Sequence, residues 1–266
     1  MPGAREWLVP GSTATIPSPV DDTGNASELI LTGERTLPGI PEENYWFQRH
    51  VVAYRYAADR VGGMNVLDAG CGEGYGSALL AERAAAVVGV DLERDVIEHA
   101  AQRYPDVRFE TGDLATLGFP DAAFDAVVTF QVIEHLVSPR GFVAECARVL
   151  KPGGVLVLST PNRLTFSPTG IRNPFHTVEF APAELRGVLE EAFDVEMLGG
   201  TFHRVRLDVV ERFMRGSLPE RLIAQPVPEW PGWLRRVVHG VRPGDFAIRE
   251  RNVDRSLDLV AVARRR

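Results

Sequence analysis

The stretch NVLDAGCGEGYG, from Asn65 to Gly76, decides how the rest of this chain is organised. A short apolar run ends in Asp68, and glycines then alternate with larger residues up to the helical pattern SALLAER. A strand that turns sharply into a helix needs residues without a Cβ atom, both to reach positive φ and to let the backbone approach a ligand. The first backbone N–H groups of the helix then face whatever lies in the turn. The stretch therefore predicts a strand, a ligand-binding turn and a helix.

The spacing of these glycines argues against a dinucleotide site. A dinucleotide fingerprint requires G-x-G-x-x-G. Counted from Gly70 or Gly72, its third glycine position is occupied by Tyr75 or Ser77. Asp68 would repel a pyrophosphate, whereas it suits a ligand that carries an ammonium group. A nicotinamide dehydrogenase is therefore only a distant alternative.

The segment from Asp68 to Gly76 resembles the first motif of class I S-adenosylmethionine (SAM)-dependent methyltransferases, and the similarity extends from about Asn65 to His176. The resemblance implies an α/β, Rossmann-like class I methyltransferase fold, with a mostly parallel seven-stranded sheet, helices on both faces and SAM as the cofactor. In that family the glycine turn lies against the methionine part of SAM. By position, this gives cofactor-binding roles to Asp68, Gly70 and Gly72.

The composition limits the class of protein. A length of 266 residues allows one sizeable α/β domain with additions. The net charge of −7 argues against nucleic acid as the main partner. Cys71 and Cys146 form neither a disulfide framework nor a zinc site, and a reducing, cytoplasmic location is the simplest expectation. Neither a signal-peptide core nor a membrane span is expected.

The order of the patterns divides the chain into five parts. We expect a flexible N-terminal tail (1–28), an N-terminal helical lid (29–63), the SAM-binding core (64–200), an inserted acceptor cap (201–255) and the final strand of the core (256–266). The alternative for the tail is that it folds over the active site. The alternatives for the insert are a solvated decoration or the contact of a homodimer.

The expected lid contains three consecutive aromatic residues. Tyr45, Trp46 and Phe47 point in different directions on a helix, so they do not all face one core. One interpretation is a helix that packs across the edge of the sheet. The other is a lid in which Tyr45 and Arg49 reach the SAM carboxylate, with Trp46 at the acceptor.

Three predicted strands end in an acid, namely Asp68, Asp91 and Asp113. Asp91 lies about twenty residues beyond the glycine turn, where folds of this kind place a carboxylate that accepts the ribose hydroxyls. The resemblance implies that Leu92 follows it in the cofactor site. It also implies that Asp113 accepts from the adenine amino group and that Leu114 lies beside the ring.

The fourth predicted strand, 124–130, is followed by Gln131, Glu134 and His135. In open α/β sheets, ligands bind outside the carboxyl ends of the strands, so we expect these residues beside the cofactor and the transferred methyl group. An acceptor hydroxyl must lose its proton, and imidazole titrates close to neutral pH. We therefore predict that His135 is the general base, with Glu134 beside it. The alternative is that His135 only hydrogen-bonds the cofactor or the loop.

Other histidines are candidates for neighbouring roles. His176, on the NPFH loop, is predicted to orient the acceptor or to replace His135 as the base, and His203 to bind the acceptor. His99 is expected at the surface. No ligand spacing demands a metal site, although Mg²⁺ held by Glu134 and nearby acids is a further option.

Four segments resemble a narrower group, the actinobacterial sugar O-methyltransferases of polymethylated polysaccharide (methylmannose or methylglucose) or glycosylated-cofactor biosynthesis. These segments are LTGERTLPGIPEENYWFQRH, FQVIEHL, STPNRLTFSP and NPFHT. The resemblance implies a saccharide hydroxyl as the acceptor. Trp230, Trp233 and the arginines of the insert would fit such a ligand. The alternatives are an O-methyltransferase of a lipid- or quinone-like molecule and a non-catalytic SAM-binding protein.

Overall fold

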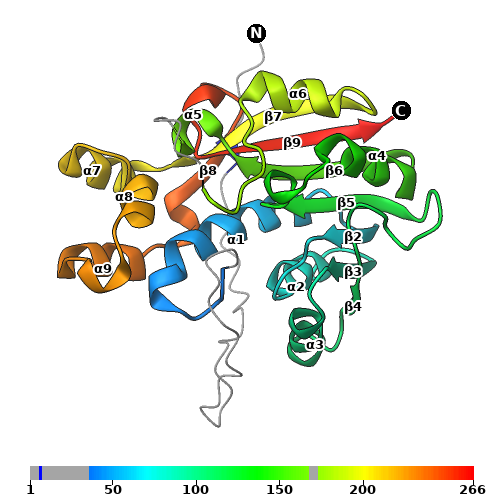
Figure 1. Ribbon diagram of the computed structural model, residues 1–266, viewed down its shortest axis with the longest axis horizontal. Coiled ribbons are helices and arrows are strands. Elements are labelled where there is room, and N and C mark those ends of the chain that lie inside the picture. The colour runs from blue at the N-terminus through cyan, green and yellow to red at the C-terminus, as the bar shows by residue number, and fades with distance from the viewer. Residues whose placement is uncertain (1–5, 8–35, 168–172) are drawn as a thin grey trace.

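The residues that the structure describes form one nine-stranded sheet, and its arrangement is drawn in Figure 1. The computed structural model describes residues 6–7, 36–167 and 173–266. The strands are β1 (Glu6–Trp7), β2 (Asn65–Ala69), β3 (Ala86–Asp91), β4 (Arg108–Thr111), β5 (Phe124–Phe130), β6 (Leu150–Pro161), β7 (Phe193–His203), β8 (Phe246–Arg249) and β9 (Asp258–Arg265). Their order in the sheet is β1-β8-β7-β9-β6-β5-β2-β3-β4.

The predicted count of seven strands is wrong, because two strands extend the sheet beyond β7. β8 belongs to the segment that was expected to be a cap, and it pairs antiparallel with β7. β1 belongs to the expected tail and pairs with β8. The other tail residues lie outside the described ranges. Strands of two and four residues are too short to show a period in the sequence.

The directions of the strands confirm a mostly parallel sheet. β4, β3, β2, β5 and β6 are joined by parallel pairings. β9 is antiparallel to both β6 and β7, so β7 points the same way as the parallel strands. Only β8 and β9 point against the rest. The carboxyl ends of β2 to β6 consequently meet along one edge of the sheet.

Helices cover both faces of the sheet, as predicted (Figure 1). The α-helices are α1 (Asn44–Ala58), α2 (Tyr75–Ala81), α3 (Arg94–Arg103), α4 (Pro139–Val149), α5 (Arg163–Phe166), α6 (Pro182–Leu189), α7 (Val205–Met214), α8 (Leu218–Ala224) and α9 (Gly232–His239). Val66 packs in the core with α1 and α2, while its neighbour Leu67 packs with α4 and α6. This alternation follows from the two-residue period of a strand. None of the described helices has the length and apolar content needed to span a bilayer.

Helix α1 is mostly buried against the sheet and against the insert. Its first residue, Asn44, donates from Nδ2 to the carbonyl oxygens of Val238 at 2.9 Å and Val241 at 3.0 Å. These contacts add side-chain donors to the carbonyl groups at and just beyond the end of α9, where the Val238 carbonyl also accepts from the Val241 N–H at 3.1 Å. The insert is therefore packed on α1 rather than free of the core.

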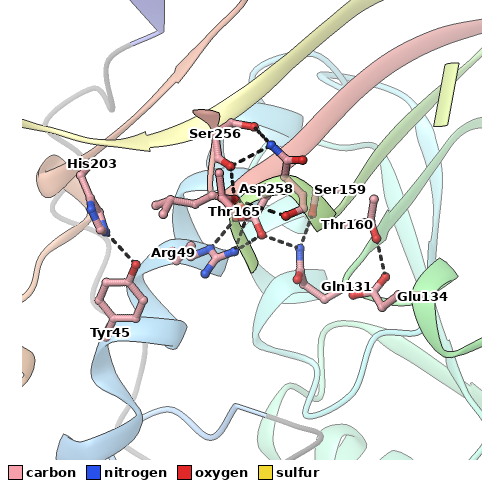
Figure 2. Close-up of polar contacts among 12 residues, drawn as sticks. Tyr45, Arg49, Gln131, Glu134, Ser159, Thr160, Thr165, His203, Ser256 and Asp258 are labelled. Atoms are coloured by element: carbon pink, nitrogen blue, oxygen red, sulfur yellow. Dashed lines mark hydrogen bonds and ion pairs between the residues drawn. The ribbon is translucent and has the colours of Figure 1, made fainter. Parts of the chain in front are cut away.

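A buried ion pair joins α1 to the last strand. Arg49 Nε donates to Asp258 Oδ2 at 2.6 Å, and Arg49 Nη2 makes a second contact with Oδ1 (Figure 2). The same Nη2 donates to the Leu257 carbonyl at 3.1 Å. Gln131, at the end of β5, also approaches Asp258 Oδ1 at 3.4 Å. The pair thus connects one helix and two strands at the edge where their ends meet.

Substitution of Asp258 by Ala should strongly destabilise the fold, because it leaves the buried Arg49 guanidinium without a counter-charge. We expect a loss of about 3–5 kcal/mol in the free energy of unfolding, measured in urea. Asp254→Ala is the matched control, since Asp254 is an exposed acid in the turn before β9. The double variant Arg49→Met, Asp258→Leu should recover most of the loss. Wild-type stability of Asp258→Ala would contradict a structural role for the pair.

Candidate active site

A cleft of about 270 Å³ lies at the carboxyl ends of β2 to β5. It brings together seven of the ten residues that were predicted to bind the cofactor, namely Gly70, Gly72, Asp91, Leu92, Asp113, Leu114 and Gln131. They come from four separate strand ends. The parallel order of these strands is what places the ends side by side.

The glycine turn presents open backbone to this cleft. Gly70 has φ of 80°, and a Cβ atom there would lie 2.3 Å from Val132 Cγ2. Gly72 has φ of 49°, and a Cβ atom there would meet nothing within 4 Å. Its N–H donates to Asp91 Oδ2 at 2.9 Å. The turn and the carboxylate thus form a cradle that opens into the cleft.

Asp68, which was also predicted to bind the cofactor, lies behind the turn and does not line the cleft. Its side chain is fully buried and accepts from Ser77 Oγ at 2.6 Å and Tyr54 Oη at 3.2 Å. Burial raises the pKa of Asp68 to about 7, and the two hydrogen bonds oppose this rise. The geometry gives Asp68 the role of holding the start of α2 against α1.

Tyr45 and Arg49, which reach the SAM carboxylate in one of the two interpretations of this helix, do not line the cleft either. The Tyr45 hydroxyl contacts His203 Nε2 at 2.7 Å, and Arg49 is held by Asp258 (Figure 2). The residues of α1 that do line the cleft are His50 and Tyr54. Residues four apart share one face of a helix, so 45 and 49 point one way while 50 and 54 point another. The sequence indicated the helix but not its rotation.

A second cavity, of about 460 Å³, adjoins the cleft. The two share Thr36, His50, Gln131 and His135 in their walls, so these residues mark the junction. The second cavity is further lined by Glu43, Trp46, Arg49, Glu134, Pro161, Phe166, Ser167, Asn173, Pro174, Phe175, His176, Leu222 and Ile223. Trp46 and His176, both predicted to contact the acceptor, therefore lie together here, and we call it the acceptor cavity.

The predicted acceptor residue His203 is not part of the acceptor cavity. It is buried at the end of β7, where Nδ1 lies 3.1 Å from Glu211 Oε2, and it borders a different cavity. The tryptophans of the insert are also elsewhere. Trp230 and Trp233 pack in the core on the α1 side of the sheet. The insert reaches the acceptor cavity only through Leu222 and Ile223 of α8, which are both apolar.

His135 stands at the junction of the cleft and the acceptor cavity. Its Nδ1 lies 3.0 Å from the carbonyl oxygen of Phe175. A carbonyl oxygen only accepts hydrogen bonds, so Nδ1 carries the hydrogen of the neutral ring. Nε2 is then left with a lone pair. The contact therefore prepares His135 to accept a proton.

Glu134 is buried beside His135 and is held by a different part of the fold. Its Oε2 accepts from Thr160 Oγ1 of β6 at 2.9 Å (Figure 2). Burial raises the pKa of Glu134 to about 8, against the opposing effect of hydrogen bonds. Glu134 is therefore able to change its charge close to neutral pH.

Glu134, His135 and His176 offer donor atoms that all lie within 4.8 Å of one another. The option of Mg²⁺ on nearby acids does not suit this group, because Mg²⁺ prefers oxygen ligands and two of these donors are nitrogens. The three side chains do lie together in the wall of the acceptor cavity, as two imidazole rings beside a buried carboxyl group. An imidazole nitrogen with a lone pair can accept a proton from a ligand bound there.

The structure reveals site residues that the sequence analysis missed. His50 Nδ1 contacts the Tyr75 hydroxyl at 2.9 Å, and burial lowers the pKa of His50 to about 4. The four-residue spacing of His50 and Tyr54 was a signal that could have been recognised. His99, expected at the surface, instead contacts Glu73 of the glycine turn at 2.7 Å. The turn is thus tied to α3 as well as to α1.

Comparisons with known proteins agree with this geometry. A family model described as a methyltransferase domain matches residues 67–158. A probable SAM-dependent methyltransferase of Mycolicibacterium smegmatis is 49% identical over 251 residues, which cover 91% of this chain and 97% of that protein. A protein of Mycobacterium tuberculosis with the same description is 45% identical, over 92% of this chain and 93% of its own length.

A solved structure supports the fold. The SAM-dependent methyltransferase of Thermotoga maritima, described as a possible histamine N-methyltransferase, superposes with a TM-score of 0.60. The match covers 84% of this chain and 94% of that one, at 14% sequence identity. At that identity the similarity concerns the fold alone. It confirms the predicted class I methyltransferase architecture.

The raised pKa of Glu134 predicts a particular pH dependence of stability in the SAM-free protein. Because the folded value of about 8 exceeds the ordinary value of 4.5, the stabilising contribution is complete below about pH 4.5. It is lost as the pH rises through 8. The free energy of unfolding should therefore fall more between pH 5 and pH 9 in wild type than in Glu134→Gln. Parallel pH profiles from urea unfolding of the two proteins would contradict this.

Proposed function

This chain belongs to the SAM-dependent methyltransferases, and from that premise we propose that it methylates a hydroxyl group of a sugar or short oligosaccharide. The observation that carries the proposal is the position of His135. Its ring has an acceptor nitrogen at the junction between the cofactor cleft and the acceptor cavity. A neutral amine can attack a methyl group without prior loss of a proton, whereas a hydroxyl needs a base.

SAM is the methyl donor, and the residues of the cleft have chemistry that fits its parts. In our proposal Asp91 accepts the ribose hydroxyls, and the backbone at Gly70 and Gly72 lies against the methionine portion. Asp113 accepts from the adenine amino group, and Leu114 lies beside the ring. A carboxylate offers several lone pairs, so Asp91 is able to bind ribose while it accepts from Gly72.

The proposed reaction is an in-line displacement. SAM supplies a methyl group bound to a sulfonium, which is the reactive carbon. The acceptor oxygen forms the new bond to this carbon, and the carbon–sulfur bond breaks with its electron pair left on sulfur. The hydroxyl proton goes to His135. Much of the protein's contribution is to hold the oxygen at near-attack distance.

The walls of the acceptor cavity support a neutral, polyhydroxylated acceptor. Trp46, Phe166 and Phe175 offer aromatic surfaces on which sugar faces can pack. Among the lining residues that the structure describes, Arg49 is the only permanent cation, and Asp258 neutralises it. An anionic acceptor would therefore lack a free counter-charge. The polar side chains beside the junction are positioned to bind hydroxyl groups.

A lipid- or quinone-like hydroxyl is the second candidate acceptor. It is favoured by the apolar contribution of the insert, since Leu222 and Ile223 are the residues of α8 that face the cavity. The tryptophans and arginines of the insert were expected to favour a sugar, but they lie outside the lining of this cavity.

Mass spectrometry can separate the two candidates. The purified protein would be incubated with SAM and either short mannosides and glucosides or hydroxylated quinone precursors. We expect a saccharide to gain one methyl group in place of a hydrogen. Methylation of the quinone precursors alone would exclude a saccharide as the acceptor. Absence of methyl transfer with both sets would favour a non-catalytic SAM-binding protein.

Asp91→Ala should weaken the binding of S-adenosylhomocysteine by about tenfold or more, because charge-assisted hydrogen bonds to ribose are lost. Isothermal titration calorimetry measures this directly. Asp95→Ala, in the exposed first turn of α3, serves as the control and should bind like wild type. Equal affinities for the two variants would overturn the ribose assignment.

His135→Ala should keep its affinity for S-adenosylhomocysteine but lower the turnover number by roughly 100-fold or more, as expected for loss of a general base. Turnover is measured by the transfer of labelled methyl groups. His239→Ala is the matched control, because His239 lies on α9 outside both cavities. Unchanged turnover of His135→Ala would transfer the role of base to another residue, with His176 first.

A further inference from the structure

Glu179 is a buried acid that contacts His176 of the acceptor cavity and takes no direct part in the proposed methyl transfer. The Glu179 side chain has 0% relative exposure, and its Oε1 lies 2.9 Å from His176 Nδ1. Among the described residues, no hydrogen-bond partner exists for its other oxygen, Oε2. Burial of a carboxylate with one partner is costly. This cost indicates that the contact with His176 serves the site.

The His176 ring is fixed on both sides. It stacks on Phe166, with ring centroids 5.4 Å apart and an interplanar angle of 27°. The ring of His135 meets it edge-on at 5.0 Å. The backbone beside it is also held, because the N–H groups of Thr177 and Val178 donate to the Glu134 carbonyl at 2.8 and 3.2 Å. The imidazole therefore has a set direction before any acceptor binds.

The contacts at Nδ1 decide which nitrogen of each ring remains to bind a ligand. A carboxylate only accepts hydrogen bonds, so Nδ1 of the neutral His176 ring carries the hydrogen and Nε2 is an acceptor. The Phe175 carbonyl has the same effect on His135. Two imidazole acceptors are thus held in the wall of one cavity. The clustered donor atoms of these rings and Glu134 lie within 4.8 Å of one another.

We propose that Glu179 is a positioning residue and that the methyl acceptor is a vicinal diol. In this arrangement His135 takes the proton of the hydroxyl that is methylated. The hydroxyl on the adjacent carbon donates a hydrogen bond to Nε2 of His176, whose tautomer and direction Glu179 sets. The adjacent hydroxyl stays intact, so the only bonds that change are those of the methyl transfer. The inference rests on the proposed function and adds a requirement for the acceptor.

The variant Glu179→Gln tests the positioning role. We expect the KM for a methylated saccharide of the mannoside and glucoside panel to rise roughly tenfold, because the acceptor strength and tautomer of His176 are no longer set by a carboxylate. Affinity for S-adenosylhomocysteine should stay at the wild-type value, which also shows that the variant is folded. Glu190→Gln, an exposed residue that pairs with Arg186, is the matched control. A wild-type KM for Glu179→Gln would overturn the proposal.

A deoxy analogue tests the requirement for two hydroxyls. The saccharide that is methylated would be compared with an analogue that lacks only the hydroxyl adjacent to the methylated position. Wild type should show a raised KM for the analogue, and Glu179→Gln should add no further effect to it. Equal KM values of wild type for the parent and the analogue would contradict the vicinal-diol requirement.

Nitrogen NMR of the His176 side chain gives a readout that does not depend on the acceptor. Wild type should show the form with hydrogen on Nδ1, and Glu179→Gln should shift the population toward hydrogen on Nε2. The same tautomer in Glu179→Gln as in wild type would contradict the positioning role of Glu179. Failure of the proposed function is distinguishable, since it would appear as a panel in which no saccharide is methylated by wild type.

Discussion

The buried pair of Arg49 and Asp258 is the interaction on which the site depends. It fixes α1 against β9 at the edge where the strands end, and Gln131 of the cofactor cleft is drawn into the same contact. With the rotation of α1 set in this way, His50 faces the cleft and Trp46 faces the acceptor cavity. Asp258 also neutralises the charge of Arg49, which lines that cavity. One contact thus shapes both compartments and their charge.

Two acidic side chains are buried at a cost, Glu134 in the acceptor cavity and Asp68 behind the glycine turn. Glu134 and Asp68 have raised pKa values because burial disfavours their charged forms. Each is held by hydroxyl groups of neighbouring elements, Glu134 by Thr160 and Asp68 by Ser77 and Tyr54.

Much of the cofactor cleft could be predicted from the sequence, whereas the acceptor cavity could not. Asp91 ends β3 and Asp113 lies just beyond β4. Parallel pairing brings such strand ends together whatever the rest of the chain does. The positions of Tyr45 and His203 could not be predicted in this way, because they depend on how a helix and a long insert pack. These two residues contact each other at 2.7 Å, outside the linings of the cleft and the acceptor cavity. Their meeting joins segments 158 residues apart and has no local signal.

The sequence by itself determined the α/β alternation, the glycine turn and the acids that end successive strands, because each follows from periodicity or backbone sterics within a short segment. Only the tertiary structure decided the rotation of α1, the two additional strands and the partners of the histidines. Those features depend on contacts between distant segments. In particular, Glu179 and Phe175 select the free nitrogen of His176 and His135, and that choice arises only when the loop docks beside β5.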